Sequence, residues 1–327
     1  MLKGHTPYFS TACGHAFLGD SLKLMESVGS GTVDLICTSP PFALLRQKGY
    51  GNVAATEYVE WFVQFSKQFK RILKPNGSLI IDIGGTWIKG HPVRSLYHLE
   101  LLLKLCKSEA DGGGGFHLAQ DLYWYNPAKL PTPAEWVTVR RVRVKDAVNT
   151  VWWLSPSENP KASNRGVLKP YSESQINLMQ NGYKAKLRPS EHQISTKFGT
   201  NNGGAIPPNL IIDPELEGAV GECVPVNVIA ASNTASNDHY LTRCRQEKID
   251  PHPARFPAAL PEFAIGLCTD PGDLVLDPFG GSLMTGHVAE RLGRKWVCFE
   301  INEDYLKGGQ LRFETFAKQP AASPAMP

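Results

Sequence analysis

The chain has 327 residues, of which 42% are hydrophobic, enough to bury the core of one large domain and carry an insertion. No stretch approaches the roughly 18 apolar residues of a membrane span, and the first residues lack the apolar centre of a signal peptide, so we expect a cytoplasmic protein without membrane contact. Seven cysteines, an odd number without a C-x-x-C pair, argue against a disulfide framework and a zinc site. The formal charge of +3 permits a nucleic-acid partner without requiring one.

Residues 1–155 alternate between strand-like and helix-like segments, as in a parallel α/β sheet. The expected strands lie at residues 15–20, 33–42, 78–85 and 121–126, and the expected helices at 21–28, 56–73 and 93–108. Aromatic and aliphatic residues at helical spacing predict a buried face on the helix 56–73, and the sequence KPNG is expected to end it. The segments 135–144 and 151–155 are predicted to form an antiparallel pair of strands, with their aromatic residues facing inward.

From residue 156 to about 245 the periodicity fades, and Pro, Asn, Gly and Ser dominate. Seven lysines or arginines against two acids make residues 161–198 locally basic. Order returns at residues 252–268. The elements expected after them are a strand at 274–281, a helix at 282–293, a strand at 295–302 and a final helix from about Glu303. Residues 318–327 are expected to be a disordered tail.

The segment LVLDPFGGSLMTGHVAERLGRKWVCFEIN predicts a βαβ unit that binds a nucleoside. Gly280 and Gly281 let the backbone approach a ligand, and Glu300 lies 20 residues beyond Gly280, the spacing at which an acid binds ribose hydroxyls. Neither a G-x-G-x-x-G dinucleotide fingerprint nor a Walker loop is present. A cofactor with adenosine but no pyrophosphate, such as S-adenosylmethionine, therefore fits better. The alternative is a tight glycine turn with a solvated Glu300.

The sequence TSPPF ends the apolar strand that begins at Val33. Two consecutive prolines cannot extend a strand ladder, and they hold the following residues in a stiff turn. Ligands of a parallel sheet bind at the carboxyl ends of its strands, so this turn and the turn at Gly280 should open on one rim. We therefore expect Ser39 and Phe42 to lie beside the cofactor.

Together these motifs resemble the amino-directed DNA methyltransferases. TSPPF is similar to motif IV, DPFGGSLMTG and FEIN to motifs I and II, HPARFP to motif X, and LGDSL to motif III. Their order is that of the β class. Serine before Pro-Pro is similar to members that methylate cytosine N4, especially restriction-modification methylases. Leu283 and Met284 depart from the small polar residues that usually follow motif I.

The resemblance implies a Rossmann-like S-adenosylmethionine-dependent methyltransferase fold. Its sheet would be mostly parallel with one antiparallel hairpin strand, and an irregular insertion would recognise the target. The parts implied are the first catalytic half at 1–155, the target-recognition region at 156–245, the second catalytic half at 246–317 and the tail at 318–327.

The resemblance assigns catalysis to Ser39, Pro40, Pro41 and Phe42. The Ser39 hydroxyl and the Pro40 carbonyl would accept hydrogen bonds from the amino group of a flipped-out cytosine, while Phe42 would stack on the base. The two prolines would fix these acceptors. Direct in-line methyl transfer is expected, without a covalent intermediate.

The resemblance assigns the cofactor to residues of motifs I, II, III and X. They are Asp20, His252, Phe256, Asp277, Phe279, Gly280, Ser282, Thr285 and Glu300. Glu300 would bind the ribose, Asp20 the adenine amino group, and Asp277 with Gly280 the methionine part. Asp20 is also a sound N-cap for the helix 21–28. No metal is expected.

Double-stranded DNA is the expected partner, with phosphate contacts from the basic insertion and from the loop after Phe42. The residues assigned to DNA are Arg46, Lys48, Lys169, Lys184, Lys186 and Arg188. Arg140, Arg141 and Arg143 are not assigned, because strand alternation would expose them with or without DNA. A separately acting restriction endonuclease and a homodimer are compatible with the resemblance.

Two other functions fit the same sequence. Adenine-N6 methylation is chemically close, because both targets are exocyclic amino groups. A non-catalytic DNA or nucleoside-binding module is the alternative from another class, and the intact S-P-P-F motif argues against it. A C5-cytosine enzyme is disfavoured because the chain has no Pro-Cys turn.

Overall fold

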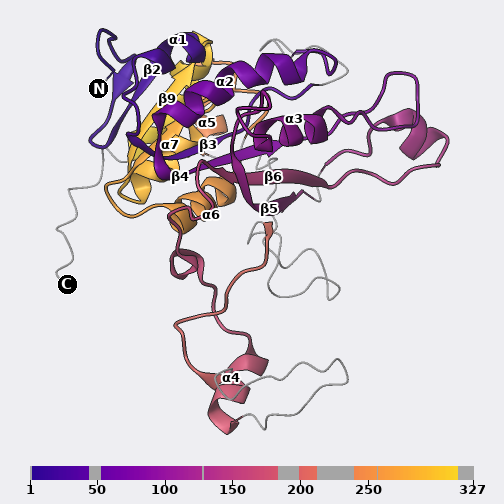
Figure 1. Cartoon of the computed structure of the whole chain (residues 1–327), viewed down its shortest axis with the longest axis vertical. Coiled ribbons are helices and arrows are strands. Elements are labelled where there is room, and N and C mark those ends of the chain that lie inside the picture. Colours follow the sequence, from indigo (N-terminus) through magenta and orange to yellow (C-terminus); the bar gives the residue numbers. More distant parts are fainter. Residues whose placement is uncertain are drawn as a thin grey trace.

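A computed structural model describes residues 2–43, 53–126, 129–182, 199–211, 239–255 and 257–315, which form a layered α/β structure around one sheet (Figure 1). The strands are β1 (Phe9–Ser10), β2 (Gly14–Leu18), β3 (Val33–Thr38), β4 (Leu73–Ile83), β5 (His117–Tyr125), β6 (Val148–Ser155), β7 (Leu210–Ile211), β8 (Leu274–Asp277) and β9 (Lys295–Glu300). The helices are α1 (Ser21–Glu26), α2 (Tyr58–Ile72), α3 (Tyr97–Cys106), α4 (Glu173–Asn181), α5 (His239–Glu247), α6 (Ala259–Cys268), α7 (Met284–Arg291) and α8 (Glu303–Gln310). Short π- or 3₁₀-helical turns are η1 (Glu135–Val139), η2 (Asn164–Val167) and η5 (Leu311–Thr315).

The sheet runs in the order β1-β2-β9-β8-β3-β4-β6-β5-β7. The strands from β2 to β4 in this order are parallel, whereas β6 is antiparallel to both β4 and β5. The predicted parallel sheet with an antiparallel hairpin strand is thus confirmed. The two-residue β1 adds a second antiparallel strand at the other edge.

Two apolar layers cover the two faces of the sheet. Helices α1, α2 and α3 bury their apolar residues against one face, and α6 and α7 cover the other. All six residues of β3 are buried, as expected of a central strand that is covered on both sides. Among the described residues, no helix combines the length and the apolar composition that crossing a bilayer would require.

The helix α2 has the buried face that its sequence predicts. Tyr58, Phe62, Phe65 and Phe69 recur at helical spacing and are buried against the sheet. The helix ends at Ile72, but the following KPNG sequence is not a separate turn, because β4 already begins at Leu73.

The strand expected over residues 135–144 is wrong. The segment forms the π-helical turn η1 followed by irregular backbone, and Val144 is 86% exposed. The expected partner, β6, already has β4 on one edge and β5 on the other, so no edge of it is left for pairing. The tryptophans of β6 are buried, as predicted.

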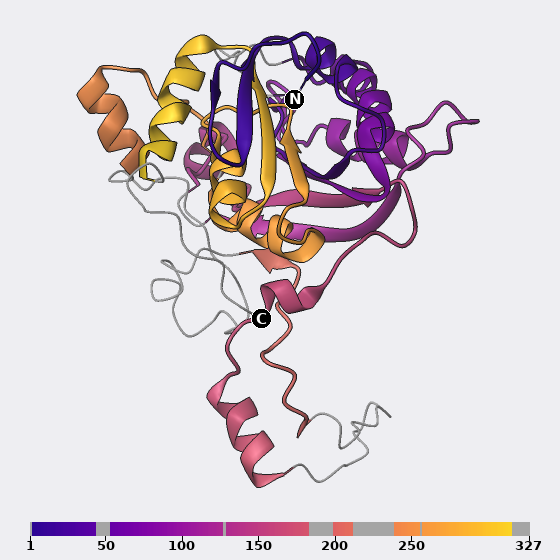
Figure 2. The same ribbon diagram turned by 90° about the vertical axis from the view of Figure 1, so that its left-hand side faces the viewer.

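The described parts of the predicted target-recognition region do not share one environment. Between β6 and β7 the chain leaves the sheet, and we call this part of the chain the excursion. The helix α4 lies in it, away from the sheet (Figures 1 and 2). By contrast, α5 packs through Tyr240 and Leu241 beside Leu311 of η5, in the C-terminal part of the chain. The helix α5 therefore continues across the predicted boundary at residue 245.

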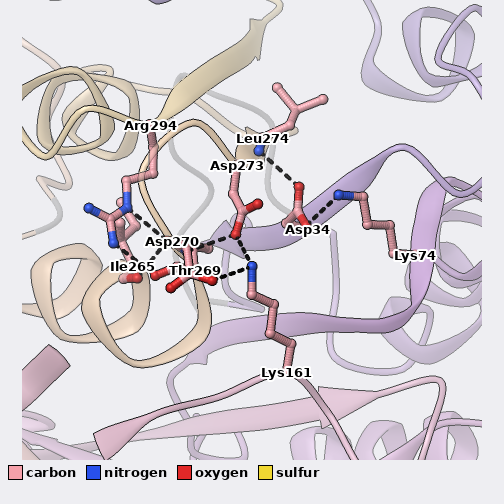
Figure 3. Close-up of polar contacts among 9 residues, drawn as sticks. All are labelled: Asp34, Lys74, Lys161, Ile265, Thr269, Asp270, Asp273, Leu274 and Arg294. Atoms are coloured by element: carbon pink, nitrogen blue, oxygen red, sulfur yellow. Dashed lines mark hydrogen bonds and ion pairs between the residues drawn. The ribbon is translucent and has the colours of Figure 1, made fainter. Parts of the chain in front are cut away.

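The start of the excursion is tied to the amino edge of the sheet by ion pairs (Figure 3). Lys161 Nζ lies 2.5 Å from Asp273 Oδ2 and 2.8 Å from Asp270 Oδ2. Beside them, Asp34 Oδ1 accepts a hydrogen bond from Lys74 Nζ at 2.6 Å, which joins the beginnings of β3 and β4. The excursion is thus anchored at the edge opposite the carboxyl ends of the parallel strands.

The turn η2 also contacts α6 directly, backbone against backbone. A Cβ atom at Gly166 would lie 2.0 Å from the carbonyl oxygen of Gly266, so only glycine allows this approach. We predict that Gly166→Ala lowers the free energy of unfolding by about 1–3 kcal/mol, because the two backbones must separate. Urea unfolding measures the change.

Gly199→Ala is the matched control, because a Cβ atom there would meet nothing within 4 Å. It should change the free energy of unfolding by less than about 0.5 kcal/mol. Equal effects of the two substitutions would contradict the close packing of η2 on α6.

Candidate active site

A cavity of about 300 Å³ opens at the carboxyl ends of β2, β3, β8 and β9. Every predicted catalytic or cofactor residue that the structure describes lines it. They are Asp20, Ser39, Pro40, Pro41, Phe42, His252, Asp277, Phe279, Gly280, Ser282, Thr285 and Glu300. Phe256 lies outside the described residues. The predicted convergence of the two turns on one rim is therefore present in the structure.

The buried carboxylate of Asp277, at the end of β8, joins the two turns. Thr38 Oγ1, at the end of β3, donates to Asp277 Oδ1 at 2.7 Å, and Thr285 Oγ1 donates to Asp277 Oδ2 at 2.7 Å. The Phe279 N–H adds a third hydrogen bond at 3.1 Å. Burial raises the pKa of Asp277, while these hydrogen bonds favour its ionised form. The carboxylate thus fixes the S-P-P-F turn against the glycine turn.

The glycine turn is held against Glu300, at the end of β9. The Gly281 N–H donates to Glu300 Oε2 at 2.7 Å, and the Asn302 N–H donates to Oε1 at 2.9 Å. Gly281 has φ +50°, which favours glycine. Glu300 is only 8% exposed, and burial raises its pKa. The alternative of a solvated Glu300 is therefore wrong.

The unusual residue Leu283 is explained by the core rather than by the cavity. Its backbone is left-handed, with φ 58°, and its side chain is fully buried. A Cβ atom at Gly309 of α8 would lie 2.6 Å from Leu283 Cγ, so the leucine fills the space that this glycine leaves. Met284, the next residue, lines the cavity instead.

Asp20 is the N-cap that the sequence predicts, and its contact with the adenine amino group stays a prediction. Its Oδ1 accepts the Leu22 N–H at 2.8 Å, which makes Asp20 the N-cap of α1, and the residue also lines the cavity. The adjacent Ser21 hydroxyl donates to the Pro278 carbonyl, which brings the start of α1 onto the turn after β8.

The Ser39 hydroxyl is part of a polar network that the sequence analysis missed. Ser39 Oγ donates to Asp82 Oδ2 at 3.0 Å, and Asn149 Nδ2 donates to Asp82 Oδ1 at 3.3 Å. Lys129 Nζ donates to Asn149 Oδ1 at 2.7 Å. Asp82 lies at the carboxyl end of β4, next to β3. An acid in the otherwise apolar sequence SLIIDIGG was the signal that could have found it.

Burial gives Asp82 an unusual acidity. Desolvation raises its pKa to about 7, although the hydrogen bonds from Ser39 and Asn149 and the charge of Lys129 favour the ionised form. A carboxylate that titrates near neutral pH can hold or release a proton under physiological conditions. The network thus places a proton acceptor directly behind Ser39.

An aromatic wall forms another side of the cavity. The ring centroid of Phe279 lies 5.0 Å from that of Phe65 and 6.0 Å from that of Trp61, both on α2. The helical spacing of these α2 residues predicts only a core position for them, yet both line the cavity. Phe42 lies against Gly84, where a Cβ atom would be 2.8 Å from its ring.

His252 lies beside the glycine turn. Its Nδ1 donates to the Ala254 carbonyl at 2.6 Å, since that oxygen can only accept, and its ring meets Tyr305 edge-on at 4.5 Å. Burial lowers the pKa of His252 to about 4, so the ring is neutral at pH 7.

Most of the predicted DNA-binding residues are not placed by the structure. Arg46, Lys48, Lys184, Lys186 and Arg188 lie outside the described residues. Lys169 is half-buried in the excursion, where its backbone pairs with Ala205 and its side chain does not line the cavity.

The described lining fits a nucleoside better than a dinucleotide. It offers a buried carboxylate, two turns rich in backbone polar groups and an aromatic wall. None of its described members is a lysine or arginine, the residues that a pyrophosphate would attract. A compact cofactor such as S-adenosylmethionine agrees with this donor set.

We predict that Glu300→Ala raises the Kd for S-adenosylmethionine at least about tenfold, or about 1.4 kcal/mol, because it removes the acceptor assigned to the ribose and leaves the Gly281 N–H unpaired. Isothermal titration calorimetry measures the change. Glu303→Ala, which removes an exposed acid on α8, should leave the Kd unchanged. Equal Kd values for Glu300→Ala and the parent protein would contradict the assigned role.

Comparison with known proteins agrees with this site. The family model for DNA methylase matches residues 33–311. The chain is 46% identical over 313 residues to the type II methyltransferase M.PvuII of Proteus hauseri, covering 95% of this chain and 86% of that protein. It is 26% identical over 309 residues to the type II methyltransferase M.BamHI of Bacillus amyloliquefaciens, covering 90% of this chain and 56% of that protein.

A solved structure of the PvuII DNA methyltransferase, described as cytosine-N4-specific, superimposes with a TM-score of 0.72 and 42% identity, covering 95% of this chain and 89% of that one. The extent of these matches includes both halves of the cavity, from the S-P-P-F turn to Glu300. The chain therefore belongs to the DNA methylase family.

Proposed function

We propose that the protein transfers a methyl group from S-adenosylmethionine to the exocyclic N4 of a flipped-out cytosine in duplex DNA. The observation that carries this function is the hydrogen bond to the buried Asp82 from Ser39, which lines the same cavity as Glu300. The similarity to a methyltransferase described as cytosine-N4-specific supports the choice of base.

When bound, S-adenosylmethionine supplies an electrophilic methyl group whose sulfur leaves with its electron pair. The protein must therefore orient a weak nucleophile and remove one proton. The Ser39 proton is engaged by Asp82, which leaves the lone pairs of Ser39 Oγ to accept an amino N–H. The Pro40 carbonyl is the second acceptor in this proposal, so both N–H groups are held and the lone pair of the nitrogen is aimed.

The proton has a direct route out. After methyl transfer the amino nitrogen carries a positive charge and gives one proton to Ser39 Oγ, which passes its own proton to Asp82 Oδ2. The raised pKa of Asp82 suits it to accept that proton near pH 7. The serine thus relays the proton and does not itself need to be ionised.

Phe42 supports the flipped base in this proposal. Taking a base out of the duplex costs roughly a few kcal/mol of stacking and pairing. A ring seated against Gly84 and lining the cavity offers a replacement stack.

The two alternatives have less support. Adenine-N6 methylation needs the same acceptors, but the similarity to a cytosine-N4-specific enzyme favours cytosine. A non-catalytic binding module would not need a proton acceptor of raised pKa behind Ser39, and a buried carboxylate without a role is costly.

The proposed partners follow from this activity. Duplex DNA is the substrate, and phosphate contacts by Arg46, Lys48, Lys169, Lys184, Lys186 and Arg188 stay a prediction. Relatives described as type II methyltransferases support a restriction endonuclease that acts separately. Because the DNA of a bacterial cell lies in the cytoplasm, the proposed site of action is the cytoplasm. Exposed leucines on one face of α3 support a homodimer.

The direct test is incubation of plasmid DNA with the protein and S-adenosylmethionine, followed by nucleoside mass analysis. N4-methylcytosine is the expected product. N6-methyladenine, or DNA without any methylated base, would contradict the proposed function.

We predict that Ser39→Ala lowers kcat at least about 100-fold, because it removes an acceptor and the proton relay together. The Kd for S-adenosylmethionine should stay within about twofold of the parent value, since Ser39 is not assigned to the cofactor. Single-turnover transfer of a labelled methyl group measures kcat. Retention of full turnover would refute the relay.

The network also predicts a pH dependence. Because ionised Asp82 is the proton acceptor, single-turnover rates should rise with pH through the Asp82 pKa of about 7. The Lys129 charge lowers that pKa, so Lys129→Met should move the midpoint to higher pH. Lys107→Met, an exposed lysine outside the network, should not move it. An unchanged midpoint in Lys129→Met would exclude Asp82 as the titrating group.

A further inference from the structure

Residues 129–147, which connect β5 to β6, project from the carboxyl edge of the sheet, on the right in Figure 1. We call this segment the β5–β6 arm. The arm begins and ends beside the hydrogen-bond network of Asp82. Its first residue, Lys129, donates to Asn149 at the beginning of β6, and Asn149 donates to Asp82. Because Asp82 in turn accepts a hydrogen bond from Ser39, the root of the arm is linked to the catalytic serine through this network.

The arm carries a concentrated positive charge. It holds five lysines and arginines against two acids, Glu135 and Asp146. Four of these cations, Arg140, Arg141, Arg143 and Lys145, fall within six residues, and all four are exposed. Arg140 also pairs with Glu135 at 2.7 Å within the arm. The whole chain has a formal charge of only +3, so the arm is far more basic than the average surface.

The arm is braced against the body of the protein. The Arg143 guanidinium donates to the Pro92 carbonyl at 2.9 Å. Asp146 accepts hydrogen bonds from Trp87 Nε1 and from Arg94. These contacts hold the backbone of the arm near Arg143 and Asp146 in a fixed position, which lowers the entropic cost of binding a ligand.

Local features of the arm are costly and do not serve its own packing. Arg141 adopts the left-handed backbone conformation with φ 55°, and η1 is a π-helical turn. Val142 is 52% exposed, and Val144 is more exposed still. Neither the left-handed Arg141 nor the π-helical turn buries apolar surface of the arm. We therefore expect these two features to serve the binding of a partner.

We infer that the β5–β6 arm is a DNA-binding surface in addition to the basic excursion, and that its cations contact phosphates flanking the target base. This inference rests on the proposed function. A base held at Ser39 stays covalently joined to its backbone, so its flanking phosphates lie close to Ser39, and the arm begins from the hydrogen-bond network that ends at Ser39. Four exposed cations complement that polyanion.

The test is the double variant Arg141→Gln/Lys145→Gln, with the affinity for a duplex measured by fluorescence anisotropy over a range of salt concentrations. Both residues lie outside the catalytic network. Each phosphate that the variant can no longer neutralise should reduce the log-log salt slope by about 0.9. We expect a slope smaller by about 1 to 2 and a Kd for DNA raised roughly tenfold at low salt. The Kd for S-adenosylmethionine and the thermal midpoint should not change.

Lys107→Gln/Lys295→Gln is the matched control, because it removes the same charge from exposed positions toward the amino edge of the sheet. An equal loss of affinity in both double variants would overturn the inference, as it would reflect net charge alone. An unchanged salt slope in the arm variant would also overturn it. So would a change in sedimentation mass with unchanged DNA affinity, which would make the arm an interface with a second copy.

The binding readout separates this inference from the proposed function. If the parent protein binds duplex but methylates no cytosine, the proposed function fails, while a reduced slope in the arm variant still supports the arm. If the parent protein methylates cytosine and the arm variant keeps the parent slope and KM for DNA, only the arm inference fails.

Discussion

The buried carboxylate of Asp277 is the contact on which the rest of the site depends. It accepts hydrogen bonds from Thr38, which lies 239 positions earlier in the chain, and from Thr285 on α7. Burial penalises its charge, and these donors offset the penalty. Through this one group the S-P-P-F turn and the glycine turn keep a fixed spacing, so a methyl donor and its acceptor can meet without rearrangement of the sheet.

Two kinds of physical effect divide the chemistry. In the proposed mechanism the proline turn contributes orientation, because it would fix acceptors around a poor nucleophile. Asp82 would contribute charge, since burial beside Ser39 raises the pKa of its carboxyl group to about 7. In the proposal both effects come from adjacent strand ends, β3 and β4, and the β5–β6 arm begins from the same network. The inferred DNA contacts would thus lie close to the catalytic serine in the structure.

The sequence predicted well what is local and periodic. The strands β3 and β8, the buried face of α2 and the turn at Gly280 follow from residue spacing, and the strand-end rule brought the two turns together. Asp82, Asn149 and Lys129 were missed because their network forms only when β6 inserts between β4 and β5. The segment 135–144 was misjudged because its alternating valines imitate a strand, whereas both edges of β6 are occupied.

A crystal structure with S-adenosylhomocysteine and a duplex containing the methylated site would test the convergence of the two turns most directly. The adenosine ribose should lie within about 3.2 Å of the Glu300 carboxylate, and the cytosine N4 within about 3.2 Å of Ser39 Oγ, in one cavity. A nucleoside bound away from Glu300, or a cytosine whose amino group faces away from Ser39, would contradict this arrangement.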